Sequence, residues 1–405
     1  MKIVVIGAGA AGLMAAANIC APTLTLERNE KAGKKLYITG KGRCNLTNDL
    51  PPDEFLKRVV KGEKFARGMI HRFPPAFVMD FFEKHGLRLK TERGGRVFPL
   101  SDKASDVTKT LLAAAVGQGA EIIYDTFVKG VERCGEGYRI IVKDGAVNDE
   151  RVIDADILII AAGGKTYPAT GSDGSIYGVL RALGHEITPL YPSLVPFVFK
   201  EDTAALRGIS LKNVGAKVWN TSAEGEILFT DNGVSGPVIL TLSALCAGHD
   251  NLKLQVDFFP KKTREEIDKR LAALLADARA GALKNTLAKL LPKSLVWYII
   301  NGLGIGNRAA ADVTKVERAA IAGALKGLEF TLSGTGGFDE AVVTRGGVSL
   351  AQVDPKTMES KVCKNLFIIG EILDMDALTG GFNLQLCFSS ALAAAEAVNK
   401  AVHSA

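Results

Sequence analysis

Apolar runs and small-residue segments alternate at the start of the chain. Residues 3–6 (IVVI) are continuously apolar, residues 7–20 (GAGAAGLMAAANIC) are small and mostly apolar, and alternation appears in residues 23–27 (TLTLE). A continuous apolar run is typical of a strand buried on both faces, and alternation predicts a further strand. The segment therefore predicts a strand, a glycine turn, a helix and a strand, which together form a βαβ unit.

The following residues continue this alternation of strands and helices. We expect a helix capped by Ser105, a strand over residues 120–128 (AEIIYDTFV), and a hairpin between Tyr138 and Val152. Residues 155–164 (ADILIIAAGG) contain an apolar run that ends in two glycines. This run is too short to cross a membrane and fits a parallel strand covered on both faces.

The pattern changes from about Pro192 to short strands separated by turns (VPFVF, GAKVW, GEILFT and LKLQVDF). Such spacing predicts a small antiparallel β domain. An apolar strand, NLFIIGE, and a long helix of small residues follow near the C-terminus. The chain is therefore expected to return to its first domain after an insertion.

Two capping-box patterns mark helices inside the insertion. Thr263 with Glu266, and Thr314 with Glu317, each place a hydroxyl residue three positions before a glutamate. We therefore expect a helical insert over residues 263–327.

These elements predict an α/β protein in which a Rossmann-type domain carries an inserted antiparallel β domain with its own helical insert. A chain of 405 residues also exceeds the usual size of a single hydrophobic core. The expected parts, in chain order, are residues 1–191 (Rossmann-type domain, first part), 192–262 (β domain, first part), 263–327 (helical insert), 328–343 (β domain, return) and 344–405 (Rossmann-type domain, second part).

The composition indicates a globular protein, since 47% of the residues are hydrophobic and 23% are charged. Six cysteines form no CxxC pair, which argues against a zinc site or a disulfide scaffold and predicts reduced thiols. The first residues lack the features of a signal peptide. We therefore expect a cytoplasmic protein without a metal or a membrane segment.

The formal net charge of +6 is mildly basic. Lys31, Lys34, Lys35, Lys41 and Arg43 are close in sequence and would suit phosphate, an acidic substrate or nucleic acid. A solvated basic face explains most of these lysines equally well. The Lys and Arg residues show no long stripe with interleaved aromatic residues, so nucleic acid is not an expected partner.

Gly7, Gly9 and Gly12 form a GxGxxG motif between the first strand and the first helix. The first glycine permits the tight turn, the second lets the backbone approach a pyrophosphate, and the third lets helix and strand pack closely. Glu27 lies 20 residues after Gly7, where an acid accepts hydrogen bonds from ribose hydroxyls. This acid favours FAD or NAD over NADP, although the adjacent Arg28 weakens that exclusion.

A C-terminal segment distinguishes FAD from NAD. Residues 367–385 (FIIGEILDMDALTGGFNLQ) predict a buried strand, a Gly-Glu pair suited to the ribityl chain, a Gly380-Gly381 turn, and a helix that begins near Asn383. The N-terminus of that helix would face the flavin edge that gains negative charge on reduction. The segment favours noncovalent FAD. The alternative is an ordinary strand, turn and helix, with Gln385 on the surface.

The chain resembles the bacterial flavoprotein family labelled aminoacetone oxidase-like or bile-acid-inducible C=C reductase-like. The motifs that carry this resemblance are GKGRCNLTN, ERGGRVFPLSDKASDV, AAGGKTYPATGSDG, LFTDNGVSGPVIL, VVTRGGVSL and GEILDMDALTGGFNLQ. They occur in the family's order from Lys2 to about Ala395. The resemblance implies an FAD domain into which a β domain and a helical domain are inserted.

The resemblance also implies a set of FAD contacts. They are Gly7, Gly9, Ala11, Gly12, Glu27, Lys35, Gly42, Arg43, Cys44, Asn45, Val128, Ala162, Gly163, Gly370, Glu371, Asp374, Gly381, Asn383, Leu384 and Gln385. The chain departs from the family pattern in GSDGSIY, where Ser175 replaces an acid and Ile176 a glycine. Cys387 and Ser390 also stand where alanine and glycine are commoner.

Catalytic residues are not identified by the sequence, which contains no triad order or metal-ligand cluster. In flavin enzymes the cofactor holds the electrons, so the protein needs only to position the substrate and tune the ring. Polar candidates near the inferred flavin are Tyr37, Arg43, Tyr167, Arg345 and Asp374, all of which also suit structural roles. Cys44 is expected to be a packed residue rather than a redox thiol, because it has no CxxC partner.

A second glycine-rich segment, residues 301–307 (NGLGIGN), resembles a nucleotide fingerprint. It follows a helical pattern rather than a strand. We therefore do not expect a second nucleotide site there.

Together these features predict an FAD-dependent oxidoreductase that exchanges hydride with a small or medium organic substrate. NAD(P)H would visit the flavin transiently as electron donor, or oxygen would act as acceptor. Reduction of an activated C=C bond is favoured over oxidation of an aminoacetone-like amine. A tRNA-acting flavoprotein is a further alternative, and the sequence does not predict the oligomeric state.

Overall fold

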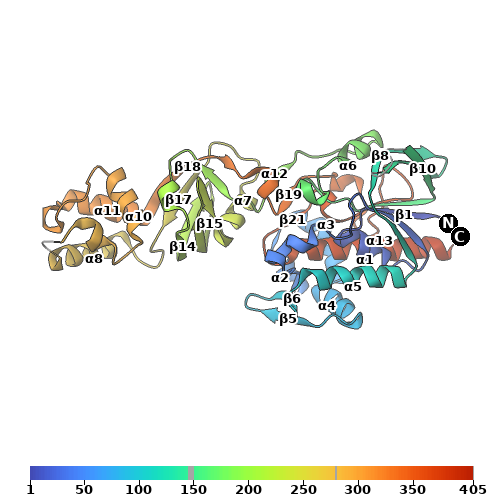
Figure 1. The fold of residues 1–405 in the computed structure, drawn as a ribbon, viewed down its shortest axis with the longest axis horizontal. Helices are drawn as coiled ribbons and strands as arrows, with labels where there is room; N and C mark the ends of the chain where they lie inside the picture. Colours follow the sequence, from blue (N-terminus) through green and yellow to red (C-terminus); the bar gives the residue numbers. More distant parts are fainter. Residues whose placement is uncertain (145–149, 279–280, 405) are drawn as a thin grey trace. The chain divides into compact units, whose positions relative to one another are not determined.

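The structure is a computed structural model that describes residues 1–144, 150–278 and 281–404. Its contacts divide the chain into two compact units. The first unit contains Met1–Ser193 and Phe338–Ala405, and the second contains Leu194–Gly337. Figure 1 shows the elements of each unit along the chain.

A parallel sheet lies at the centre of the first unit, with strand order β20-β11-β1-β2-β7. Its strands are β1 (Ile3–Ile6), β2 (Thr23–Leu26), β7 (Ala120–Ile123), β11 (Ile157–Ile160) and β20 (Leu366–Ile368). All residues of β1 and β11 are buried, as expected for strands covered on both faces. The predicted α/β fold with a Rossmann-type sheet is therefore confirmed.

Helices complete the core of the first unit. Those described are α1 (Ala10–Ala16), α2 (Pro52–Leu56), α3 (Glu63–Arg72), α4 (Pro75–Lys84), α5 (Ala104–Gly117), α6 (Ile176–Ala182) and α13 (Phe382–His403). The long helix α13 packs against α1 although more than 350 residues separate them in sequence. The C-terminal segment thus returns to the first βαβ unit.

The first unit also contains short antiparallel sheets. Their strands are β3 (Thr47–Asn48), β5 (Leu89–Glu92) and β6 (Arg96–Pro99); β8 (Thr126–Cys134), β9 (Gly137–Asp144) and β10 (Glu150–Ala155); β4 (Val59–Lys61) with β21 (Asp376–Ala377); and β12 (Tyr191–Ser193) with β19 (Val343–Arg345). The expected hairpin between Tyr138 and Val152 is confirmed as β9 and β10. Residues 145–149 of that prediction lie outside the described residues.

Two local predictions in this unit are wrong. Helix α5 begins at Ala104 with Lys103 as its N-cap, so Ser105 lies inside the first turn instead of capping the helix. The strand expected over residues 120–128 is divided into β7 and β8. Asp125 adopts a left-handed conformation (φ 51°) between them and turns the chain out of the central sheet.

The second unit contains a closed antiparallel barrel with strand order β13-β16-β15-β14-β17-β18. Its strands are β13 (Phe197–Phe199), β14 (Ser210–Val218), β15 (Thr221–Phe229), β16 (Gly233–Ser235), β17 (Lys253–Asp257) and β18 (Leu328–Thr335), with α7 (Pro237–Leu245) packed against β15. The predicted short antiparallel strands are confirmed. Their closure into a barrel removes the exposed edges that an open sheet would leave.

Between β17 and β18 the chain forms α8 (Arg264–Asp277), α9 (Leu283–Leu287), α10 (Lys293–Gly302) and α11 (Lys315–Gly327). Both predicted capping boxes are confirmed, at Thr263 for α8 and at Thr314 for α11. A short helix, α12 (Gly337–Glu340), begins where the chain returns to the first unit.

Candidate functional site

The first glycine turn is packed tightly against the central sheet. A Cβ on Gly7 would lie 2.6 Å from the carbonyl oxygen of Ala161, and one on Gly12 would lie 1.8 Å from that of Gly7. Neither position can accept a side chain without moving backbone. A Cβ on Gly9, by contrast, would meet no atom within 4 Å. The protein's own packing therefore leaves open space beside Gly9, as close approach of a ligand to the backbone requires.

Glu27 directly follows β2 and is held against this turn. Its side chain is buried, and Oε2 accepts a hydrogen bond from the Ala8 N–H at 2.8 Å. Oε1 accepts from both the backbone N–H and the side-chain amide of Asn29, at 3.0 and 2.6 Å. Burial raises the pKa of Glu27 above its ordinary value, while these hydrogen bonds oppose the shift. The neighbouring Arg28 pairs with Asp173 at 2.7 Å.

Val128 lies on β8, next to the same region. Thr126, two residues earlier, donates its backbone N–H to the carbonyl oxygen of Glu27 at 2.9 Å. Val128 itself is buried. Val128 thus lies two residues along β8 from the residue that bonds to Glu27, and its contact with adenosine stays a prediction.

Lys35 connects three segments that are far apart in sequence. Its Nζ lies 2.6 Å from Oε2 of Glu371 and 2.7 Å from Oγ1 of Thr166, which it donates to. The Thr344 N–H donates to Oε1 of Glu371 at 3.1 Å. Two predicted residues, Lys35 and Glu371, therefore meet in an ion pair. Thr166 and Thr344 were not predicted as site residues, although they lie within the motifs AAGGKTYPATGSDG and VVTRGGVSL.

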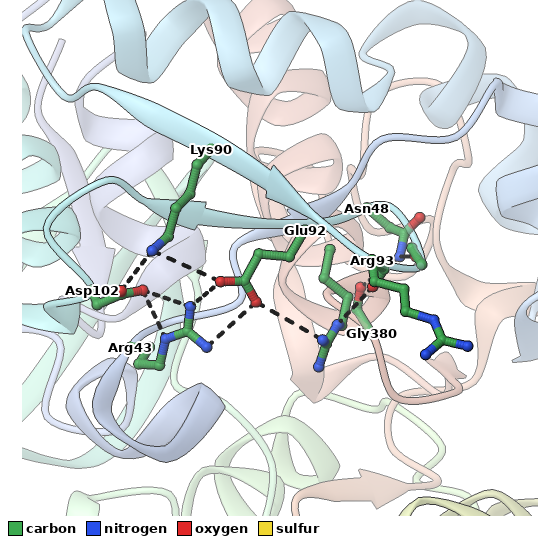
Figure 2. A network of polar contacts seen from close by, with 9 residues as sticks. Arg43, Asn48, Lys90, Glu92, Arg93, Asp102 and Gly380 are labelled. Carbon is green, nitrogen blue, oxygen red and sulfur yellow. Dashed lines mark hydrogen bonds and ion pairs between the residues drawn. The ribbon is translucent and has the colours of Figure 1, made fainter. Parts of the chain in front are cut away.

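The GKGRCNLTN loop, residues 40–48, is tied to the hairpin formed by β5 and β6. Arg43 pairs with Glu92 and, at 2.6 Å, with Asp102, and its guanidinium lies over the Phe98 ring. Figure 2 shows this network and its continuation through Lys90. The charge of Arg43 is thus paired within the protein. Gly42, the next predicted contact, is exposed and has a left-handed backbone.

The Cys44 thiol is completely buried in this loop. Burial raises its pKa to about 12, so the thiol stays protonated at neutral pH. A protonated buried thiol is a poor nucleophile, which agrees with a packing role. The adjacent Asn45 has a buried Oδ1 that accepts no hydrogen bond from any described residue.

The C-terminal glycine turn presses against the strand that ends this loop. A Cβ on Gly381 would lie 2.3 Å from the Thr47 carbonyl oxygen, so only glycine fits. Oε1 of Gln385 accepts from the Thr47 hydroxyl at 2.6 Å, and its amide donates to the Phe73 carbonyl at 3.1 Å. Gln385 is fully buried, which excludes the alternative that placed it on the surface.

Asn383 holds the same turn from its other side. Its Oδ1 accepts from the Ala377 N–H at 2.9 Å, and its Nδ2 donates to the Ala377 carbonyl at 2.8 Å. Leu384 is half-buried at the start of α13. In Figure 2, Asn48 reaches the Gly380 carbonyl, to which it donates at 3.0 Å. The N-terminal loop and the C-terminal turn are therefore parts of one structure.

The segment after β11 contains further buried polar atoms. Gly163, which follows Ala162, has φ +76°, and its Cβ would lie 3.1 Å from the Ser172 hydroxyl. Among the described residues, neither the Ser172 hydroxyl nor the buried Tyr177 hydroxyl has a hydrogen-bond partner. Burial raises the pKa of Tyr177 strongly, so its phenol is neutral. Buried polar atoms of this kind normally bind a ligand or an ordered water.

Gly370 and Asp374 complete the predicted set. A Cβ on Gly370 would lie 2.8 Å from the Cβ of Ala11, so α1 and the C-terminal segment are in direct contact. Asp374 is buried, and the Lys61 ammonium lies 3.9 Å from its carboxylate. The predicted residues thus belong to a few segments of the first unit. The charge of Arg43 is paired with Glu92 and Asp102, which are not among them.

The polar candidates for catalysis are mostly engaged with protein groups. Arg345 forms two hydrogen bonds of 2.9 Å with the buried Asp376, whose other neighbour is the Ser193 hydroxyl at 3.0 Å. The Lys31 ammonium lies over the Tyr37 ring. Burial raises the pKa of Tyr167. Across the described residues, no three His, Cys, Asp or Glu side chains are grouped as metal ligands.

The chain is similar to known proteins along nearly its whole length. A model of the HI0933-like protein Rossmann domain matches residues 1–397. The 3-dehydro-bile acid delta(4,6)-reductase of Clostridium scindens is 31% identical over 98% of both chains. The ribosomal RNA dihydrouridine synthase of Haemophilus influenzae is 29% identical over 98% of both, and that of Escherichia coli is 27% identical over 97% of this chain and 96% of the relative.

Solved structures of flavoenzymes share the fold. A flavocytochrome c3 fumarate reductase matches with a TM-score of 0.54 at 15% identity, over 98% of this chain and 78% of that one. A 3-ketosteroid-delta4-(5alpha)-dehydrogenase from Rhodococcus jostii gives the same TM-score and identity, over 98% and 96%. Among the described helices, none is both long and apolar enough to span a membrane.

Proposed function

This chain belongs to the HI0933-like family of FAD-binding flavoproteins, which are flavin-dependent oxidoreductases, and from that premise we propose that it reduces a C=C bond conjugated to a carbonyl group. We propose NAD(P)H as the electron donor. A visiting donor requires no second dinucleotide fold, and the 301–307 segment follows helix α10 rather than a strand.

One observation carries this proposal: relatives matched over almost the whole chain have names that describe the same type of reaction. A 3-dehydro steroid unsaturated at positions 4 and 6 is a conjugated ketone. Formation of dihydrouridine saturates the ring C=C bond of uracil, which is also conjugated to a carbonyl. In either reduction the C=C bond would gain a hydride at one carbon and a proton at the other, with the conjugated carbonyl accepting electron density in between.

The residues of the first unit suit the flavin that such a reaction needs. Reduced FAD supplies the hydride when it is bound. The open space beside Gly9, the Glu27 carboxylate, and the unpartnered buried oxygens of Asn45 and Ser172 would hold the cofactor. Lys35 and Glu371 would position the segments around it through their ion pair.

Two substrates compete within this reaction type. A small or medium enone is favoured by the bile-acid reductase, the relative at 31% identity. A uracil base in RNA is the second candidate and is favoured by the two relatives named for ribosomal RNA. Oxidation of an aminoacetone-like amine is the alternative reaction.

Product analysis tests the proposal. The purified flavoprotein is incubated without oxygen with NADPH or NADH and either a steroidal enone or uracil-containing RNA, which is then digested to nucleosides. We expect one substrate to gain two hydrogen atoms by mass spectrometry. Absence of reduced product, together with oxygen consumption in a parallel aerobic incubation with an amine, would contradict the proposal.

A further inference from the structure

Most of the net positive charge of the chain comes from one short segment of the second unit. Residues 278–311 contain five basic residues and no aspartate or glutamate, so they carry +5 of the formal net charge of +6. The rest of the chain is therefore nearly neutral. The basic residues of the segment are Arg279, Lys284, Lys289, Lys293 and Arg308.

Helix α10 has one buried face and one exposed face. Leu295, Val296, Ile299 and Ile300 are buried within the second unit. On the opposite side, Lys293, Trp297 and Asn301 follow one another at spacings of four residues, and all three are exposed. Side chains four residues apart lie on the same face of a helix. This face therefore presents a cation, an indole and an amide in one row.

Helix α9 adds a second cation to this row. The Lys284 ammonium lies 5.1 Å from the centre of the Trp297 ring, in a cation–π contact. Lys289 is exposed in the connection between α9 and α10. Within the described residues, none of Lys284, Lys289 and Lys293 has a carboxylate partner, whereas Arg308 pairs with Glu317 at 2.9 Å. Three lysine charges thus remain unneutralised. We call Lys284, Lys289, Lys293, Trp297 and Asn301 the basic face.

We propose that the basic face binds RNA through its phosphate backbone, with Trp297 stacking on an unpaired base. Unpaired lysines bind phosphates with release of counterions, and an exposed aromatic ring gives a sequence-tolerant platform for bases. Asn301 adds hydrogen-bond donors without negative charge. The choice of RNA over another polyanion rests on the RNA candidate of the proposed function. The position of the surface rests on the charges and contacts alone.

The basic face cannot be recognised from the order of residues in the sequence. Its residues are separated by apolar positions that turn inward, so no continuous basic and aromatic stripe appears in the chain. Folding of α9 onto α10 brings Lys284 to Trp297 across 13 sequence positions. A missing stripe in the sequence therefore does not exclude a nucleic-acid-binding surface that forms on folding.

The test compares two double charge reversals in the full-length flavoprotein. Lys289→Glu with Lys293→Glu changes the basic face, and an acid at Lys293 also suits the first turn of α10, so folding should be preserved. Lys212→Glu with Lys217→Glu is the matched control: both lysines are exposed on β14 and lack a described carboxylate partner, and the net charge changes equally. The probe is a fluorescently labelled RNA hairpin with a single-stranded loop.

Binding is measured by fluorescence anisotropy between about 50 and 200 mM salt. We expect the basic-face variant to bind at least about tenfold more weakly, with a slope of log K against log salt that is shallower by about 2. The control should keep the affinity and slope within about a factor of two of the wild type. Trp297→Ala should weaken binding but leave the slope unchanged, because an indole carries no charge.

Several outcomes would overturn the proposal: no RNA binding by the wild type, equal losses in both double variants, or stronger binding to vesicles containing an anionic lipid than to the hairpin. Enone reduction is measured in parallel on each variant. Normal RNA binding without reduction of any substrate would contradict the proposed function alone. Normal enone reduction without RNA binding would contradict the basic face alone.

Discussion

The two units each contain a glycine-rich turn, and the turns differ in what surrounds them. In the first unit, a Cβ on Gly12 would lie 1.8 Å from a carbonyl oxygen. In the second, Cβ atoms on Gly302, Gly304 and Gly306 would meet nothing within 4 Å. One turn follows a buried parallel strand, whereas the other ends helix α10. The two segments have similar glycine spacing. Only the one between a buried strand and a helix forms the tightly packed turn that is typical of dinucleotide-binding sites.

The largest expected contrast comes from adding one methyl group to each turn. Gly12→Ala must move the start of α1 away from the Gly7 carbonyl, so we expect it to cost about 3 kcal/mol and to abolish flavin retention. Gly306→Ala places alanine at a φ of +69° without a clash and should cost about 1 kcal/mol. The ratio of flavin to protein absorbance after purification measures the contrast. Equal flavin content in both variants would contradict the claim that only the turn at Gly12 is needed for flavin binding.

Glu27→Ala should give the next largest effect. It removes the acceptor for the Ala8 N–H and for Asn29, and an unsatisfied buried donor costs about 1–3 kcal/mol. We expect weaker FAD binding, measured by titration of the apoprotein, and a lower Tm. The control is Glu30→Ala, which removes an exposed carboxylate that pairs with the nearby Lys34. A normal flavin affinity in Glu27→Ala would show that this carboxylate does not contact the cofactor.

The sequence predicted the closely packed glycine turns of the first unit better than the ion pairs near them. Gly7, Gly12 and Gly381 follow from local rules, because only glycine fits where backbones touch. The ion pairs of Arg43 with Glu92 and Asp102 depend on a hairpin about 50 residues later in the chain. No local sequence pattern predicts them.

The boundary errors have the same origin. Ser105 fits an N-cap by residue type, yet the N-cap of α5 is Lys103, two residues earlier. The break between β7 and β8 at Asp125 depends on a left-handed residue that apolar periodicity does not register. The basic face was also hidden, since it depends on how α9 packs on α10. The start of α5, the break between β7 and β8, and the basic face all depend on tertiary contacts.

The Arg43 network should stabilise the first unit in a pH-dependent way. Hydrogen bonds from Arg43 lower the pKa of Glu92, and bonds from Lys90 and Arg43 lower that of Asp102. Their stabilisation is therefore complete above the ordinary values of 4.5 and 3.8 and is lost as the pH falls through the lower folded values. Arg43→Ala should reduce Tm at pH 7, and the difference from wild type should shrink below pH 4.

A matched change in the second unit sharpens this result. Arg207 pairs with Asp231 where both side chains are more than two-thirds exposed. Because solvent screens such a pair, Arg207→Ala should change Tm less than Arg43→Ala does. A difference between Arg43→Ala and wild type that stays constant from pH 7 to pH 3 would contradict the network account.

The smallest effect concerns Cys44. With a pKa of about 12 and no exposure, it should resist iodoacetamide at pH 8, while the exposed Cys20 and Cys134 react. Mass spectrometry of peptides after timed alkylation gives the order of reaction. Modification of Cys44 at the rate of Cys20 in the folded protein would indicate an accessible thiolate and reopen a redox role.

Reoxidation of the flavin tests the central claim most directly. The protein is reduced anaerobically with NADPH and then mixed in a stopped-flow instrument with an enone, with uracil-containing RNA or with air-saturated buffer, while flavin absorbance is followed. We predict that one of the two unsaturated substrates restores the oxidised spectrum faster than oxygen does. Rapid reoxidation by oxygen, with neither substrate having an effect, would contradict a C=C reductase and indicate an oxidase.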